Sequence, residues 1–280
     1  MQITDSCVHI WGADTPERPW PPIADPKTQP HKPFPFTKEY ILGEMAKAGV
    51  DRVVLVPAVW EGERNDLAIA AVQEHPDRFR IMGRFNPEAP GSRKLMPTWL
   101  QQPGMLGVRI AFHRTERRPL LTEGRIDWLW QQAEQFGVPI MLFARHEDLY
   151  LIDRVAERHP GLKLVIDHLG LTEGKDEEAF REFDKLLALA KRPNVAVKAS
   201  TLPKFTTDAY PFRRLHPYLR RVYDTFGPKR MFWGSDLSVI PCSYLQSVTM
   251  FTEEMPWIPR GDLELIMDRG LRDWIGWKLQ

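Results

Sequence analysis

The sequence of 280 residues contains only two cysteines, Cys7 and Cys242, which are too few for a disulfide framework. It also lacks any stretch that approaches the ~20 consecutive apolar residues of a membrane-spanning helix. The N-terminal sequence MQITDSCVHIW has neither the basic start nor the apolar segment of a signal peptide. These absences favour a reducing compartment, and we expect a cytoplasmic protein that has no membrane partner.

An excess of charge of either sign is lacking as well. The 38 basic residues nearly balance the 37 acidic ones, for a formal net charge of +1, so no global field attracts nucleic acid. Internal repeats and low-complexity tracts are absent from the sequence. Because 43% of the residues are hydrophobic, the chain can bury a substantial core, and we expect a single domain over residues 1–280. A homo-oligomer is left open.

The sequence does contain a regular alternation of short apolar runs and longer amphipathic segments. Eight of the runs are nearly continuous in apolar residues, which is typical of strands that are buried on both faces. We expect these strands at residues 3–10, 51–58, 78–85, 107–112, 138–143, 163–169, 194–200 and 230–236.

Seven amphipathic segments between the strands are predicted to be helices. They cover residues 37–49, 65–75, 93–102, 126–137, 147–159, 176–192 and 210–227. Thr37 suits an N-cap, and Gly49, Gly137 and Gly227 stand where glycines end helices. Eight strand–helix units predict the α/β class and, within it, a (β/α)8 TIM barrel.

The segment after the first predicted strand, residues 11–36, carries eight of the 25 prolines and cannot form an ordinary helix. A doubly wound sheet, the competing fold, usually has a glycine-rich phosphate-binding turn at this point, and this sequence has none. Loops of this length are usually functional or disordered. On a barrel, this proline-rich loop would lie over the C-terminal mouth, where catalytic residues gather.

Polar side chains occur at the C-terminal ends of the predicted strands. Cys7 and His9 are two residues apart on the first strand, so they point to the same side. Each residue alone has a structural explanation: Asp236 could cap a helix, and Lys198 could pair with an acid across the barrel. Their occurrence at one end of the barrel indicates an active site. The candidates are Cys7, His9, Trp11, Arg84, Arg109, Arg114, Arg145, His168, Lys198, Ser200 and Asp236.

Several segments, in order along nearly the whole chain, resemble the amidohydrolase-related family and within it the branch of pyrone-dicarboxylate and sugar lactonases. They are DSCVHIW, GVDRVVLV, NDLAIAAVQEHPDRF, GVRI, LVIDHLG, PNVAVKAS, WGSD and RGLRDWIGW. The resemblance implies a distorted (β/α)8 barrel with a His-x-His pair on strand one, a His on strand six and an Asp on strand eight. This chain has Cys7, His9, His168 and Asp236 at those positions, so the first departs from the family pattern.

A second departure concerns strand five, where metal-dependent relatives tend to have a histidine and this chain has Phe143. Sulfur, nitrogen and oxygen ligands all occur in zinc sites, so Cys7, His9, His168 and Asp236 could hold zinc or another divalent metal. Because Cys7 and Phe143 both depart from the pattern, we instead predict a site without a metal or other cofactor.

Without a metal, ester hydrolysis needs a base for water and a hydrogen-bonding group for the oxyanion. We assign Asp236 as the base, and His9 and His168 as donors to the carbonyl oxygen. A nucleophilic Cys7, activated by His9 or His168, is the second option. It is less favoured because side chains at i and i+2 of a strand point in parallel.

Arginines at the strand ends predict a small anionic substrate, because the planar guanidinium group suits carboxylates. With the resemblance, they predict a carboxylic ester hydrolase that opens a carboxylated lactone by water attack. A decarboxylase of an aromatic or unsaturated acid, a metal-free isomerase or cyclase on the same barrel, and a non-catalytic binding protein are the alternatives. The residues assigned to substrate binding are Arg84, Arg109, Arg114, Arg145, Lys198, Ser200 and Trp11.

Overall fold

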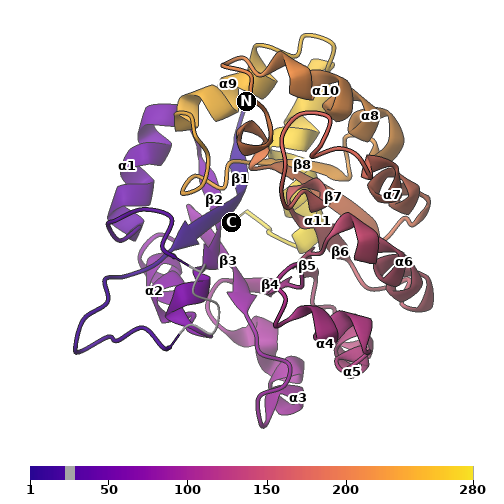
Figure 1. Cartoon of the computed structure of the whole chain (residues 1–280). Coiled ribbons are helices and arrows are strands. Elements are labelled where there is room, and N and C mark those ends of the chain that lie inside the picture. Colours follow the sequence, from indigo (N-terminus) through magenta and orange to yellow (C-terminus); the bar gives the residue numbers. More distant parts are fainter. Residues whose placement is uncertain (23–28, 280) are drawn as a thin grey trace.

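The computed structural model describes residues 1–22 and 29–279. Within them, eight parallel strands follow one another in chain order and form a nearly closed barrel, which confirms the predicted (β/α)8 TIM barrel (Figure 1). Each strand lies where the sequence predicts one. The strands are β1 (Thr4–Ile10), β2 (Arg52–Pro57), β3 (Phe79–Arg84), β4 (Met105–Ala111), β5 (Ile140–Phe143), β6 (Leu164–Ile166), β7 (Val195–Ser200) and β8 (Met231–Gly234).

Helices surround the barrel and bury their apolar faces against the sheet (Figure 1). Within the described ranges, no helix is both long and apolar enough to cross a membrane. The α-helices are α1 (Lys38–Ala48), α2 (Asp66–Glu74), α3 (Ser92–Leu95), α4 (Arg118–Thr122), α5 (Asp127–Gln135), α6 (Leu149–Arg158), α7 (Phe183–Leu187), α8 (His216–Phe226), α9 (Tyr244–Thr252), α10 (Arg260–Glu264) and α11 (Gly270–Ile275).

The helix ends illustrate where the sequence pattern was sufficient. Thr37 accepts a hydrogen bond from the Tyr40 amide, and Gly49 adopts a left-handed conformation with φ 70°, as the cap signals predict. The helix predicted over residues 176–192 is wrong in its first part, since α7 begins only at Phe183. Asp176 instead accepts hydrogen bonds from the hydroxyls of Thr206 and Thr207, and these long-range contacts hold it outside the helix.

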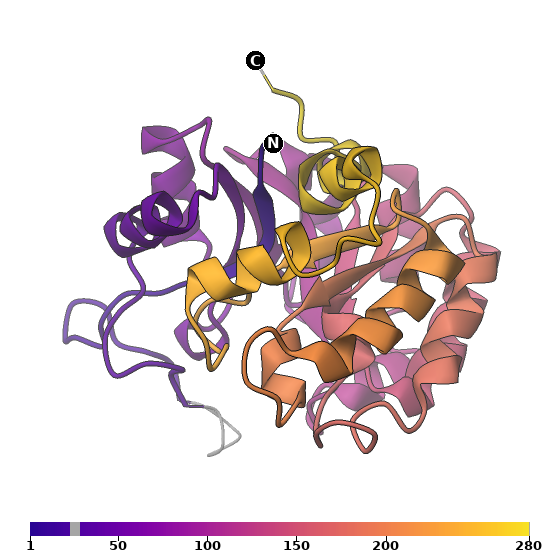
Figure 2. The ribbon, with the colours of Figure 1, turned by 90° about the horizontal axis from the view of Figure 1, so that it is seen from above.

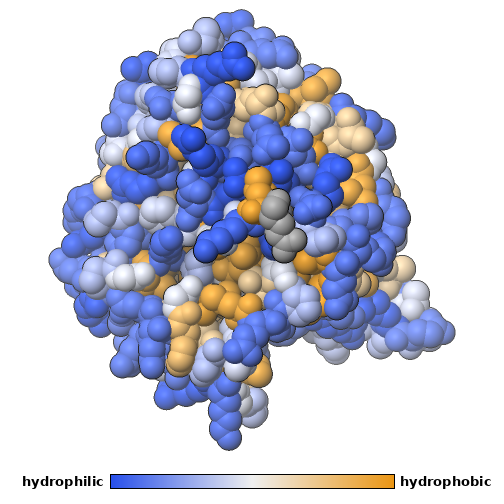
Figure 3. All heavy atoms as spheres, turned by 180° about the vertical axis from the view of Figure 1, so that it is seen from behind, coloured by the Kyte–Doolittle hydropathy of each residue, from blue (hydrophilic) through white to orange (hydrophobic). Residues whose placement is uncertain are grey.

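The two ends of the barrel differ. Leu271 and Ile275 of α11, with Trp277, pack against barrel-interior side chains and cover the end where the strands begin (Figure 2). The surface seen from behind in Figure 3 is mostly hydrophilic, with apolar patches between charged groups. The opposite end, where the strands finish, is left for the loops that form the site.

The seam between β1 and β8 is closed by a buried carboxylate. Asp5 accepts hydrogen bonds from the Cys7 and Ser235 amides and from the hydroxyls of Ser235 and Tyr244. Burial, which these hydrogen bonds partly offset, raises the pKa of Asp5 to about 6. Beside it, the Asp236 amide donates to the Cys7 carbonyl at 2.9 Å. The backbone of Asp236 is therefore fixed at the seam.

Candidate active site

A cavity of about 240 Å³ lies at the C-terminal ends of the strands. Residues from or just after β1, β4, β5, β6, β7 and β8 line it, together with part of the proline-rich loop. Its titratable lining consists of four histidines, three cations and one carboxylate. These residues are His9, His31, His113, His168, Arg109, Arg114, Lys204 and Asp236.

Three residues that line this cavity have left-handed backbones. The φ angles are 53° at His168, 64° at Thr201 and 57° at Asp236, and only six non-glycine residues of the described chain have positive φ. Such a conformation is costly for residues other than glycine and persists where surrounding contacts impose it. The concentration of strain at this cavity supports a functional role for it.

Asp236 presents one unpaired oxygen to the site. Its Oδ2 accepts a hydrogen bond from the Thr201 hydroxyl at 2.9 Å. Its Oδ1 is buried, has no hydrogen-bond partner among the described residues, and lies 3.5 Å from Nε2 of His9. A buried acceptor without a donor is costly, so this oxygen is a natural point for a ligand.

His9 faces Asp236 as an acceptor. Its Nδ1 lies 2.9 Å from the Val56 carbonyl, and because a carbonyl only accepts, Nδ1 carries the proton. Burial, aided by the charge of Arg109, lowers the pKa of His9 to about 3, so the ring is neutral and Nε2 is unprotonated. The structure therefore differs from our expectation that His9 donates to a carbonyl oxygen. Nε2 and the carboxylate Oδ1 instead form a pair of acceptors.

His168 is held by two hydroxyl groups, one at the end of β7 and one on the residue that follows it. Its Nδ1 lies 2.8 Å from Oγ of Ser200 and 2.7 Å from Oγ1 of Thr201. Since Thr201 donates its only proton to Asp236, it accepts from Nδ1 of His168. Burial lowers the pKa of His168 to about 3, which leaves Nε2 unprotonated, 3.8 Å from Oδ2 of Asp236. Three acceptor groups thus converge: two imidazoles and one carboxylate.

Below the cavity, a buried carboxylate joins two buried cations. Asp167 lies 2.7 Å from Nζ of Lys198 and accepts from Nε of Arg109 at 2.9 Å. Burial alone would raise the pKa of Asp167, but the positive charges of Lys198 and Arg109 hold it well below its usual range. The two cations therefore share one carboxylate, that of Asp167. Lys198 is fully buried and does not line the cavity; it does pair with an acid, as expected, but that acid follows the neighbouring strand β6 and does not lie across the barrel.

The other predicted residues divide into two groups. Arg109 and Arg114 line the cavity. Ser200 does not line it but contacts His168, which does. The structure does not bring the rest to its walls. Arg84 is buried against Glu63, Arg145 donates to the His113 carbonyl beside a separate hollow, and Trp11 stacks on Phe36 behind Trp60.

The lining also includes residues that were not predicted as site residues, among them His31, His113, Thr201 and Lys204. His113 follows β4, and Thr201 and Lys204 follow β7, so position just after a strand was the available signal. His31 belongs to the proline-rich loop; its Nδ1 lies 2.8 Å from Oγ of Ser238, and its ring packs 5.5 Å from that of His9. No local pattern predicts such a contact.

Cys7 lies beneath His9, fully buried among barrel-interior side chains. Burial raises the pKa of its thiol to about 12, so the sulfur is protonated and a poor nucleophile. Ligand atoms of Cys7, His9 and Asp236 lie within 4.8 Å of one another, and their S, N and O donors fit zinc chemically. At the end of β5, Phe143 packs edge-on against the ring of His168, with 4.9 Å between centroids.

The chain belongs to the amidohydrolase family, whose match covers residues 4–273. A curated relative, L-fucono-1,5-lactonase of Burkholderia ambifaria, is 26% identical over 246 residues, which are 84% of this chain and 80% of the relative. The family and this relative identify the protein as a hydrolase of the amidohydrolase superfamily.

Two solved structures share the fold. A probable 2-pyrone-4,6-dicarboxylic acid hydrolase from Acinetobacter baumannii, with citric acid bound, has a TM-score of 0.75 at 16% identity and covers 99% of this chain and 100% of its own. An amidohydrolase from Burkholderia multivorans with bound zinc has a TM-score of 0.80 at 16% identity, with 99% of each chain covered. At this identity, the likeness supports the fold alone.

Proposed function

We propose that the protein opens a lactone that carries one or more carboxylate groups, by attack of water and without a metal ion. The observation that carries this proposal is the pair of acceptors formed by Oδ1 of Asp236 and Nε2 of His9, 3.5 Å apart in a cavity lined by cations. The lactonase named among the relatives supports the reaction type. Citric acid in the related hydrolase structure supports an anionic ligand.

The acceptor pair suits a water molecule, which has two protons to donate. Held by Asp236 and His9, this water attacks the lactone carbonyl carbon as its proton moves to Asp236. The ring C–O bond then breaks, and the proton passes from Asp236 to the departing alkoxide oxygen. A positioned base of this kind contributes ~10²–10⁴-fold to the rate. His168, through Thr201, keeps the carboxylate oriented.

Because His9 and His168 present unprotonated nitrogens, they cannot stabilise the oxyanion while neutral. That role passes to Arg109 and Arg114 at the cavity wall, and Lys204 is left to pair with the substrate carboxylate. Cations outnumber carboxylates in the lining, which favours an anionic substrate. Arg109 is anchored by its hydrogen bond to Asp167.

The charge count supports a metal-free site. Arg109 and Lys198 share one buried carboxylate, Asp167, so buried cations already outnumber their acid here, and a divalent cation would add to that excess of positive charge. If a metal were bound, Cys7, His9 and Asp236 would hold it, and it would supply Lewis-acid polarisation of the carbonyl.

Because a divalent cation would add to the buried positive charge, we expect purified protein to contain far less than one zinc, manganese or iron per chain. It should also keep its activity in a chelator. Elemental analysis measures the metal content, and lactone hydrolysis rates before and after dialysis against a chelator measure the activity. One tightly bound ion per chain, with activity lost on its removal and restored by its return, would contradict the proposal. In that case Cys7→His should keep or improve metal binding.

Lys204→Ala should raise KM for a carboxylated lactone about two- to fivefold, the range expected when an exposed charge pair is lost. KM for a neutral lactone with the same ring should change much less, because it offers no carboxylate to pair. Steady-state kinetics with the two substrates test this expectation. Lys204 is the better position for the test, since Arg109→Ala would also remove a partner of buried Asp167.

Lys175→Ala, at an exposed lysine that does not line the cavity, is the matched control and should change neither KM value. Equal increases of KM for both substrates in Lys204→Ala would mean that Lys204 acts through structure rather than through charge.

A further inference from the structure

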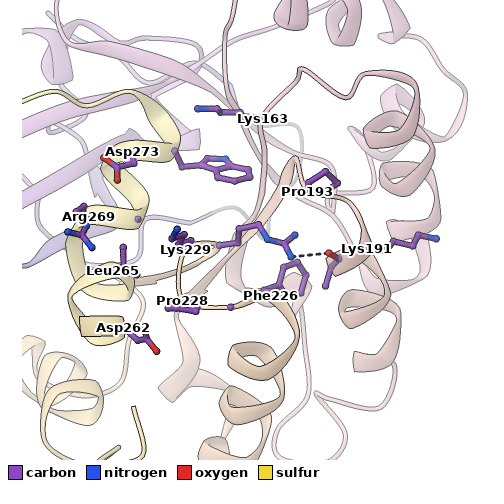
Figure 4. Close-up of a pocket in the computed structure, with 15 residues that line it drawn as sticks. Lys163, Lys191, Pro193, Phe226, Pro228, Lys229, Asp262, Leu265, Arg269 and Asp273 are labelled. Carbon is purple, nitrogen blue, oxygen red and sulfur yellow. Dashed lines mark hydrogen bonds between the residues drawn. The ribbon is translucent and has the colours of Figure 1, made fainter. Parts of the chain in front are cut away.

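A hollow larger than the catalytic cavity lies elsewhere on the chain. It is a groove of about 1080 Å³ at the opposite end of the barrel, where Lys163, Pro193 and Arg230 precede β6, β7 and β8. The segment from Asp262 to Trp274 forms its other wall (Figure 4). Small-molecule sites commonly enclose ~300–1,000 Å³, so this groove is large enough for a ligand.

The floor of the groove is apolar and aromatic. Phe226 and Leu265 are buried, and the ring of half-buried Trp274 also lines the hollow. Nε1 of Trp274 is buried and has no hydrogen-bond partner among the described residues. The groove therefore offers an apolar and aromatic surface to a ligand with a flat body.

Positive charge dominates the rim. Lys163 lies over the Trp274 ring at 5.9 Å, and neither Lys229 nor Arg269 has an ion-pair partner in the described part of the chain. Two acids also line this wall: Asp262 accepts a hydrogen bond from Tyr223, and Asp273 is exposed, four residues from Arg269. Lys191 is paired with an acid outside the groove and points away from it (Figure 4). The basic residues of the lining therefore outnumber its acidic residues, which favours an anionic ligand.

A rare backbone feature places part of this wall. Residues Leu265–Arg269 form a π-helical turn, in which the Gly270 amide donates to the Leu265 carbonyl. A Cβ at Gly270 would lie 2.8 Å from that carbonyl oxygen, so the turn requires glycine here. π-Turns are uncommon and are often found at functional sites. This one carries both Leu265 and Arg269 to the groove.

We propose that this groove is a second binding site, which takes a small organic anion with a flat apolar body, of the aromatic carboxylate class. The apolar body lies against Phe226 and Trp274, and the carboxylate pairs with Lys229 and Arg269. The site is separate from the catalytic cavity, since the two share no lining residue.

Calorimetric titration with naphthalene carboxylate and with its neutral carboxamide tests the proposal. We expect the carboxylate to bind more tightly than the carboxamide, and the double variant Lys229→Glu/Arg269→Glu to weaken carboxylate binding at least about tenfold. Both substituted residues are exposed, so the fold should survive. Lys204→Glu, which reverses a charge of the catalytic cavity, should leave this binding unchanged.

Three results would overturn the proposal. The first is the absence of any binding of naphthalene carboxylate. The second is binding that Lys204→Glu abolishes and the double variant leaves intact, since the ligand would then occupy the catalytic cavity. The third is a dimer in sedimentation experiments that the double variant dissociates, which would make the groove a contact between copies of the chain.

Discussion

Asp236→Asn should lower kcat ~10²–10⁴-fold while the fold is kept or even stabilised. The amide has nearly the shape of the carboxylate and still accepts the Thr201 hydrogen bond, but it cannot take a proton from water. Its NH2 group can also donate to Nε2 of His9, which faces only another acceptor in the native protein. Steady-state kinetics and thermal unfolding measure the two effects separately.

Asp224→Asn, on the exposed face of α8, is a matched control and should leave kcat unchanged. Cys7→Ser tests the competing thiol mechanism. Because the pKa of the buried thiol is raised to about 12, we expect this variant to lower stability more than turnover. If Cys7→Ser abolished turnover and Asp236→Asn were tolerated, a covalent thiol mechanism would replace the water mechanism.

Asp167→Asn should lower the free energy of unfolding by ~3–5 kcal/mol, the typical cost of removing one partner of a buried ion pair. The substitution leaves the cations of Lys198 and Arg109 without their shared carboxylate inside the barrel. Urea denaturation followed by circular dichroism measures the loss. Asp153→Asn, which breaks a half-buried pair with Arg192, should cost less.

A second substitution distinguishes charge from shape. In Asp167→Asn/Lys198→Met, the fully buried cation is removed together with its partner, and most of the lost stability should return. A double variant as unstable as the single one would mean that Asp167 stabilises the barrel through packing or hydrogen bonds rather than through charge.

The sequence predicted the barrel well because its signals are local. Nearly continuous apolar runs indicated each strand, and the cap signals at Thr37 and Gly49 placed the ends of α1. The predicted start of α7 was wrong because contacts between residues far apart in the chain determine it. Asp176 is held by Thr206 and Thr207, 30 and 31 residues away, and no local pattern reports such contacts.

The candidate site was predicted in part. His9, His168, Arg109 and Asp236 follow from one rule, that residues ending the strands of a parallel barrel meet at one mouth. His31 lies in the proline-rich loop, whose course depends on long-range packing, so its side chain could not be placed from sequence.

By itself, then, the sequence determined the barrel, the family and the end of the molecule that carries the chemistry, because strand periodicity and strand order fix those features. Only the tertiary structure decided what each group can do there. In the folded chain, Lys198 pairs with Asp167 and does not line the cavity. Nδ1 of His9 donates to the Val56 carbonyl there, and Nε2 is therefore an acceptor. Charge pairing and tautomer depend on distances of a few ångströms between residues far apart in the chain, and sequence spacing does not contain those distances.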